Sequence, residues 1–214
     1  MNADTFSITD GITLLLFDEQ RQLASTFMRF QEHYESPHFR GEVFTREEFK
    51  AWYQEQNDAF TYFEDWNGFN IPSNAIKPFY DGRFDPLTEN EQGFLNEFKD
   101  AKPPFYVIGT HRQTNNMTDY LKHETAHGLF HTDRSYREDA RNVVSRHNTS
   151  PIEEELLSTS GYHPDVIEDE VHAYSIASHE KLDARFPEPL RTKMQSIYDE
   201  YSEKHNVTFP NSIT

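Results

Sequence analysis

The chain must build its core mainly from aromatic side chains, and this feature limits its possible folds most strongly. Only 35% of its 214 residues are hydrophobic, yet these include 18 Phe, 11 Tyr and 2 Trp. One buried aromatic side chain removes about 150–250 Å² of surface from water. We therefore expect an ordered chain with an aromatic core, because disordered chains contain few aromatic residues. The length is typical of one domain or slightly more.

Acidic side chains outnumber basic ones by 37 to 20, which gives a formal net charge of −17. This charge disfavours partners such as nucleic acids and anionic membranes, which attract Lys and Arg. It favours either cationic substrates or simple solubility. The chain contains 11 His and no Cys, which excludes disulfides, thiolate metal sites and a cysteine nucleophile. Any bound metal would therefore need imidazole and carboxylate ligands.

No apolar run approaches the ~20 residues that span a bilayer. The most apolar N-terminal run, residues 14–17, follows Asp4 and Asp10 and has no basic residue before it, so a signal peptide is not expected. The sequence therefore predicts a cytoplasmic protein without a membrane partner, and it indicates no particular oligomeric state.

Hydrophobic periodicity and capping residues predict an α+β fold that is mainly helical. In the first hundred residues we expect strands at 12–17, 60–63 and helices at 20–34, 45–57 and 88–99. Thr45 with Glu48, and Thr88 with Glu91, form two capping-box patterns. In the second half we expect a strand at 105–109 and helices at 116–131, 133–147, 151–161, 164–186 and 190–201.

The segment 66–87 has no clear periodicity and combines Gly and Pro with five aromatic residues. We expect it to be irregular, and its aromatic content disfavours a solvated linker. Long irregular loops of this kind are often functional. Two interpretations stay open, a coil packed on the core or one wall of a binding cleft.

The motif H-E-T-A-H, His123 to His127, lies in the helix expected at 116–131. Residues four apart share one helical face, so His123 and His127 can reach the same metal ion. Glu124 then lies beside that ion and can accept a proton from water without being a ligand. Random placement would give about 0.06 matches to H-E-x-x-H in a chain of this composition.

A catalytic zinc site needs a third protein ligand, and three residues compete for this role. His131 shares the face of His123 but lies about 12 Å further along the helix axis, which suits a supporting role. Asp133 lies ten residues after His123, and it can also cap the next helix. Glu170 lies in the helix expected from Pro164.

Glu170 shares a helical stripe with the apolar residues Val166, Ala173 and Ala177 and with Tyr174, which predicts that its carboxylate is buried. A buried carboxylate needs a counter-charge or a metal. The metal interpretation makes Glu170 the third ligand. The alternative is a structural salt bridge to one of the arginines Arg137, Arg141 and Arg146.

Periodicity separates the neighbours of Glu170 on this helix. Glu168 and His172 are expected on the opposite face, in contact with solvent. Asp169 is expected to one side of the buried stripe.

These residues resemble the zincin metallopeptidases, and specifically the gluzincin branch, over roughly residues 105–180. The resemblance implies a zincin-like region over 101–205, packed with a helical and aromatic region over 1–100 in one compact domain, with a tail at 206–214. It implies one zinc ion with His123 and His127 as ligands, Glu170 as third ligand and Glu124 as general base. The sequence V-H-A-Y after Glu170 departs from the best-known gluzincins.

The resemblance also implies that the strand before the H-E-x-x-H helix is an edge strand beside the substrate. An extended peptide would then add to this edge at Tyr106, Val107 and Ile108. Tyr174, one turn beyond Glu170, is a candidate donor to the oxyanion. Other candidates are Tyr162, His163, His172 and Tyr136.

The implied activity is hydrolysis of a peptide bond in a peptide or protein substrate. Zinc would lower the pKa of its bound water to ~7, and Glu124 would pass the proton to the leaving amine. Two alternatives remain: a zincin-fold binding or regulatory protein without peptidase activity, and a zinc hydrolase of a non-peptide amide.

Overall fold

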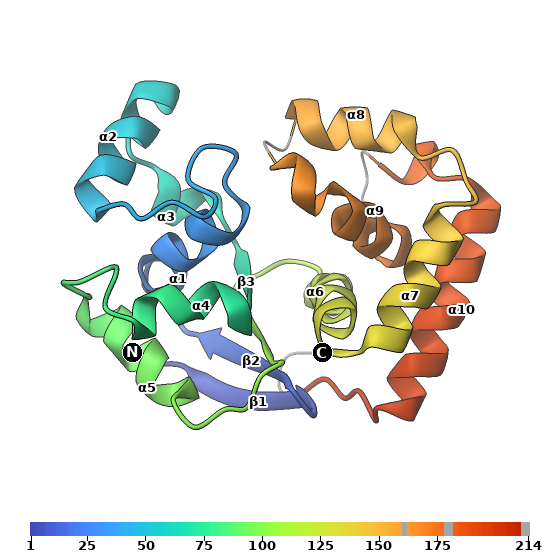
Figure 1. Cartoon of the computed structure of the whole chain (residues 1–214), viewed down its shortest axis with the longest axis horizontal. Coiled ribbons are helices and arrows are strands. Elements are labelled where there is room, and N and C mark those ends of the chain that lie inside the picture. Colours follow the sequence, from blue (N-terminus) through green and yellow to red (C-terminus); the bar gives the residue numbers. More distant parts are fainter. Residues whose placement is uncertain (160–161, 178–181, 211–214) are drawn as a thin grey trace. The chain divides into compact units, whose positions relative to one another are not determined.

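The computed structural model describes residues 1–159, 162–177 and 182–210 (Figure 1). It contains two compact units. The first unit comprises Met1–Phe6 and Thr13–Asn115, and the second comprises Ser7–Ile12 and Asn116–Thr214. Within the described ranges, no helix is long and apolar enough to cross a membrane. The expected α+β architecture, mainly helical with a small sheet, is confirmed.

Four strands form the sheet among the described residues: β1 (Asp4–Thr9), β2 (Ile12–Phe17), β3 (Gly68–Pro72) and β4 (Tyr106–His111). The helices of the first unit are α1 (Gln20–Glu35), α2 (Arg46–Asn57), α3 (Tyr62–Asp65), α4 (Ser73–Tyr80) and α5 (Glu89–Phe98). The second unit contains α6 (Met117–Thr132), α7 (Arg134–Val144), α8 (Ser150–Thr159), α9 (Ile167–Ile176) and α10 (Glu188–Lys204). It also contains the 3₁₀ turns η1 (Pro164–Val166) and η2 (Asp183–Arg185).

The strand before the H-E-x-x-H helix is not an edge strand, so this expectation was wrong. The sheet has the order β1-β2-β4-β3, which places β4 between two neighbours. The backbone groups of β4 therefore bond to neighbouring strands, and a peptide cannot add to Tyr106, Val107 or Ile108. All three side chains are fully buried.

The edge strand next to β4 is β3, which runs antiparallel to it with Asn70 opposite Ile108. This edge offers few hydrogen-bond donors. The N–H of Asn70 donates to Gln31 Oε1 at 3.1 Å, and Pro72 has no N–H. Strand addition, which depends on main-chain donors and acceptors, is thus disfavoured at β3 as well.

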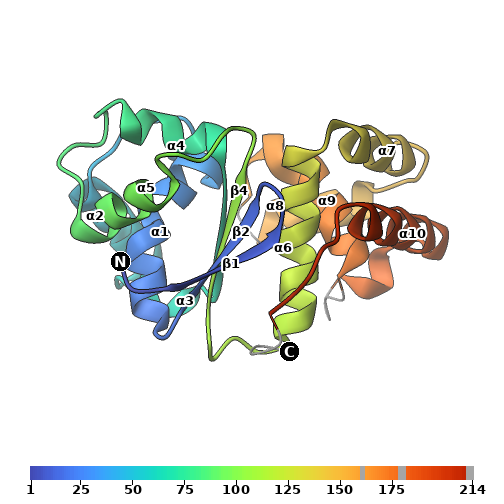
Figure 2. The same ribbon diagram turned by 90° about the horizontal axis from the view of Figure 1, so that it is seen from below.

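The core of the first unit is aromatic, as the composition predicts. Phe27, Phe30 and Phe94 are fully buried, and the ring of Phe30 lies 4.6 Å from that of Phe94 between centroids. Figures 1 and 2 both show α1, α4 and α5 on the same face of the sheet. These helices contribute Phe27, Phe30, Phe79 and Phe94 to the core.

The segment 66–87 is more regular than expected, because it contains β3 and α4. Its Pro78 lies inside α4, and proline there masked the helical pattern. Phe69, Phe79 and Phe84 are buried in the core, and the Phe79 and Phe84 rings stack at 3.8 Å. The interpretation as a segment packed on the core is therefore confirmed for these residues.

The predictions around α2 and α5 are confirmed, whereas the prediction around α3 is not. Both capping boxes are present, with the side chains of Thr45 and Thr88 accepting from Glu48 N and Glu91 N. The strand expected at 60–63 is wrong, because Tyr62–Asp65 is the short helix α3. Tyr62 is buried against the aromatic rings of Phe49 and Tyr53, and this packing outweighs the β propensity of the aromatic run.

In the second unit, α6 and α10 lie close to their expected positions. Asn116 precedes α6 in a left-handed conformation, and its side chain forms no capping hydrogen bond. The long helix expected at 164–186 is wrong. It is divided into η1, α9 and η2, and Ala177 after α9 is extended. The stop expected at Gly161 lies outside the described residues.

The turn between β1 and β2 approaches α6 closely within the second unit, as Figure 2 shows. Gly11 in this turn has φ +78°, a conformation that glycine adopts without a steric penalty. A Cβ built on Gly128 of α6 would lie 2.7 Å from Ile12 Cδ1. Gly128, directly after the H-E-T-A-H motif, therefore allows the hairpin to pack against the helix that carries the motif.

Candidate metal centre

Helices α6 and α9 bring together His123, His127 and Glu170, all in the second unit. The Nε2 atoms of His123 and His127 are 3.1 Å apart. Glu170 Oε2 lies 3.8 Å from His123 Nε2, and Glu170 Oε1 lies 3.6 Å from His127 Nε2. One ligand atom from each residue lies within 4.8 Å of the other two, so this group could hold a metal ion.

Burial and charge both fit a cation at this position. Glu124, Asp169 and Glu170 are at most 7% exposed, and buried carboxylates need compensation. Among the described residues, the ion-pair partners of Asp169 and Glu170 are histidines. Within the same ranges, Glu170 Oε2 is buried without a hydrogen-bond partner. A divalent cation would satisfy this oxygen and neutralise the excess negative charge.

Two of the three arginines proposed as alternative partners of Glu170 pair with other groups, and none of the ion pairs found among the described residues joins Glu170 to an arginine. Arg137 donates to the backbone carbonyl of Phe130 at 2.7 Å. Arg141 pairs with Glu168 at 2.8 Å, where both side chains are about half exposed. The salt-bridge alternative for Glu170 is thus not supported, and the expected solvent contact of Glu168 is confirmed.

Burial and the close approach of several carboxylates shift the pKa values of the side chains in the site. Burial raises the pKa of Glu170 to about 8, and the carboxylates of Asp169 and Glu124 add to this shift. Burial lowers the pKa of His127, but Asp169 and Glu170 outweigh it and hold this pKa well above the usual value. Without a metal, protons bound to these side chains would supply the positive charge that a cation would otherwise supply.

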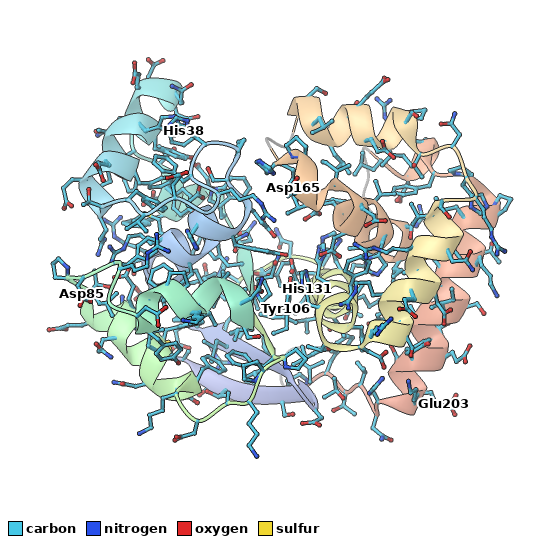
Figure 3. The ribbon with its side chains drawn as sticks, in the orientation of Figure 1. His38, Asp85, Tyr106, His131, Asp165 and Glu203 are labelled. Atoms are coloured by element: carbon cyan, nitrogen blue, oxygen red, sulfur yellow. The ribbon has the colours of Figure 1, made fainter. Side chains whose placement is uncertain are left out.

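Asp169 lies at the centre of a second group of contacts behind the ligands. Its Oδ1 is 2.9 Å from His127 Nδ1 and 3.3 Å from His172 Nδ1. Its Oδ2 is 2.9 Å from His131 Nε2; His131 is labelled on α6 in Figure 3. His172 Nε2 is in turn 2.8 Å from the Tyr136 hydroxyl. The supporting role expected for His131 agrees with this geometry.

The expected solvent contact of His172 was wrong, because it is buried, and Asp169, expected to one side of the buried stripe, is buried as well. The ring of His172 stacks on Phe130 of α6 at 5.0 Å and contacts Tyr136 of α7. Helix α9 is therefore covered on two faces, whereas the periodicity argument assumed one buried stripe. The role of Asp169 was therefore not predicted, although a carboxylate next to Glu170 in a His-rich segment was a usable signal.

Asp133, the competing third ligand, has a different function in the structure. Its carboxylate caps α7 by accepting from Ser135 N and Tyr136 N. It also contacts Lys204 and His205. Burial alone would raise the pKa of Asp133, but these contacts lower it to about 2. Asp133 is not a member of the metal-ligand group.

Two of the candidate oxyanion donors lie next to the ligands. The ring of Tyr174 is 4.4 Å from that of His123 between centroids, and its hydroxyl is 3.2 Å from that of Tyr162. Both tyrosines are half-buried. His163 Nδ1 accepts from the backbone N–H of Asp165. The remaining candidates, His172 and Tyr136, are fully buried and bonded to each other, so neither can reach a substrate.

Comparison with known proteins adds no identification at this point. No protein-family model matches the chain, and no curated protein or solved structure is similar enough to count as a match.

Proposed function

We propose that this protein is a zinc-dependent hydrolase of peptide bonds with a gluzincin-like site. The observation that carries the proposal is the convergence of His123, His127 and Glu170 beside Glu124. Two imidazoles and one carboxylate are a ligand set of catalytic zinc sites, which keep one position open. The side chain of His123 is 13% exposed, whereas that of Glu170 is 2% exposed. His123 is thus the more exposed of these two ligands, and a substrate would approach from its side.

His123, His127 and Glu170 would hold the ion. Zinc supplies Lewis acidity, which polarises a carbonyl and acidifies water. Glu124 would accept the proton of the attacking water at its carboxylate and deliver it to the leaving amine. Glu124 is buried at 5% exposure, and its charge acts on Glu170, so it lies near the ligand group.

Tyr174 would donate its hydroxyl proton in a hydrogen bond to the oxyanion that develops on the substrate. Its ring lies against His123, which places it at the solvent-accessible side of the ligand group. The hydroxyl of Tyr162, 3.2 Å away, would orient that donor. Such a preorganised donor stabilises the transition state more than the ground state.

The test combines zinc content with cleavage of a fluorogenic peptide library. The Glu124→Gln variant should retain one zinc per chain, while the cleavage rate falls by about 10²–10⁴-fold. Glu168→Gln is the matched control, because Glu168 is an exposed carboxylate on α9 paired with Arg141; its cleavage rate should not change. Absence of zinc from the unmutated protein after incubation with stoichiometric zinc would refute the proposal.

A second candidate, hydrolysis of a small non-peptide amide, is favoured by one observation. The strand expected to align a peptide lies inside the sheet, and the β3 edge has few free donors because Gln31 occupies the N–H of Asn70. A small acyl amide needs no strand for binding. Cleavage of small acyl amides by the zinc-loaded protein, without cleavage of any library peptide, would select this candidate.

A further inference from the structure

The carboxylate of Asp169 determines which ring nitrogens carry hydrogen in three histidines. A carboxylate oxygen that lies at hydrogen-bond distance from an imidazole nitrogen accepts a hydrogen bond from its N–H. His127 Nδ1, His172 Nδ1 and His131 Nε2 lie 2.9, 3.3 and 2.9 Å from its oxygens. Each of these three nitrogens must therefore be a donor.

This assignment directs the other nitrogen of His127 toward the proposed ligand group. That atom is Nε2, which lies 3.1 Å from His123 Nε2 and 3.6 Å from Glu170 Oε1. A zinc ion would take up this nitrogen in its unprotonated form, and the bond to Asp169 would fix the orientation of the ring. Because His131 holds the second oxygen at 2.9 Å, the carboxylate cannot rotate away from His127 without losing that bond.

The hydrogen bonds continue from His172 to Tyr136 of α7. His172 donates from Nδ1, so its Nε2 is an acceptor, and the Tyr136 hydroxyl 2.8 Å away must donate to it. Tyr136 and His172 are both 0% exposed, so no solvent competes for these bonds. A relay of hydrogen bonds thus runs from Tyr136 through His172 and Asp169 to His127. This relay connects α7 and α9 to the ligand on α6, and each donor in it faces an acceptor.

We propose that Tyr136 and His172 are positioning residues which, through Asp169, set the affinity of the site for its metal. This inference rests on the proposed function, because it concerns the same ligand group. Residues behind a metal ligand typically change metal affinity by about 10–100-fold when they are replaced. Here the effect would reach the metal from a residue on a third helix.

The first test is the tautomer of His172, measured by ¹⁵N NMR of histidine-labelled protein without added metal. The expected tautomer carries hydrogen on Nδ1. The backbone carbonyl of Asp169, 3.1 Å from His172 Nδ1, favours the same form, so the comparison of variants is needed to test the bond from Tyr136. In Tyr136→Phe the Nε2 resonance should shift, because it loses the hydrogen bond from the hydroxyl, and Tyr201→Phe should leave it unchanged.

The second test is zinc affinity by competition with a chelator. Tyr136→Phe should bind zinc about 10-fold more weakly and Asp169→Asn about 10–100-fold more weakly than the unmutated protein. Tyr201→Phe is the matched control, since its ring packs on Tyr136 and its hydroxyl bonds to Asp139 outside the relay. Circular dichroism and thermal melting would establish that each variant folds.

The two tests separate this inference from the proposed function. Zinc binding by the unmutated protein together with an Nε2–H tautomer of His172 would overturn the relay alone. Equal zinc affinities for Tyr136→Phe and Tyr201→Phe would overturn it as well. Failure of the unmutated protein to bind zinc would overturn the proposed function, and with it the role of the relay in affinity, whatever the tautomer.

Discussion

His123 Nε2 and His127 Nε2 lie 3.1 Å apart on α6, with both imidazoles directed to the same point beside Glu170. Their spacing of four residues follows from the helix, since residues i and i+4 share a face. The third member comes from α9, about forty residues later in the chain. The sequence leaves open whether this third ligand is Glu170 or Asp133.

The third ligand can be tested by comparing two carboxylate variants. Glu170→Gln should lose stoichiometric zinc, because an amide oxygen carries no charge to offset the cation. Asp133→Asn should retain zinc, because Asp133 caps α7, and Asn is an equally good cap. The measurement is zinc per chain by atomic absorption after dialysis. Zinc loss in Asp133→Asn with retention in Glu170→Gln would reverse the assignment.

Glu32 in α1 makes the first unit sensitive to pH. Burial raises its pKa to about 7, although a hydrogen bond from Tyr62 opposes the shift. The folded state thus holds a proton that the unfolded state releases near pH 4.5. The unfolding free energy should therefore fall by about 2–3 kcal/mol as the pH rises from about 4.5 to about 7.

Glu32→Gln should remove this fall and make the first unit more stable than the unmutated protein at pH 8. Urea unfolding can be followed by tryptophan fluorescence, because Trp52 and Trp66 both lie in the first unit. Glu64→Gln is the control, since Glu64 is an exposed carboxylate in the same unit. An unchanged pH profile in Glu32→Gln would contradict this prediction.

The buried ion pair between Arg29 and Glu91 should be essential for the first unit. Arg29 Nε and Nη2 each donate to Glu91 at 2.7 Å, and both side chains are at most 3% exposed. Arg29→Met would leave Glu91 buried without its partner and should destabilise the unit by about 3–5 kcal/mol. Arg21→Met, which breaks the exposed pair with Glu64, should cost less than about 1 kcal/mol. Equal losses in urea unfolding would show the prediction to be wrong.

Gly128 should be required for packing of the β1–β2 turn on α6. Alanine in a helix normally stabilises by about 1 kcal/mol relative to glycine. Here its Cβ would lie 2.7 Å from Ile12 Cδ1, so Gly128→Ala should instead destabilise by about 1–3 kcal/mol. Ile12→Val removes the Cδ1 atom, and the double variant should recover part of the loss. Thermal melting of the four proteins measures this coupling, and a more stable Gly128→Ala would contradict it.

Much of the fold was predictable where local chemistry decides it. The capping boxes at Thr45 and Thr88 and the apolar stripe of α10 gave correct helices. β1 was missed, although Asp10-Gly11 between two β patterns is a hairpin signal. The end of α9 at Ile176 depends on tertiary packing, and no residue type near it predicts this end.

The site was predictable to the extent that one helical face contains it. His123, Glu124 and His127 follow from a local motif, and Glu170 follows from one buried stripe on α9. Asp169 and His172 did not follow, because α9 is buried against both α6 and α7, and a helix buried on two faces has no single stripe. Tyr136, 36 residues away from His172, could be connected to it only by the folded chain.

The decisive measurement is anomalous diffraction at the zinc edge from crystals of protein incubated with one equivalent of zinc. The proposed function predicts a single strong peak within coordination distance of His123 Nε2, His127 Nε2 and the Glu170 carboxylate, at about 2.0–2.2 Å from each. A peak at Asp133, or the absence of any peak between α6 and α9, would contradict it.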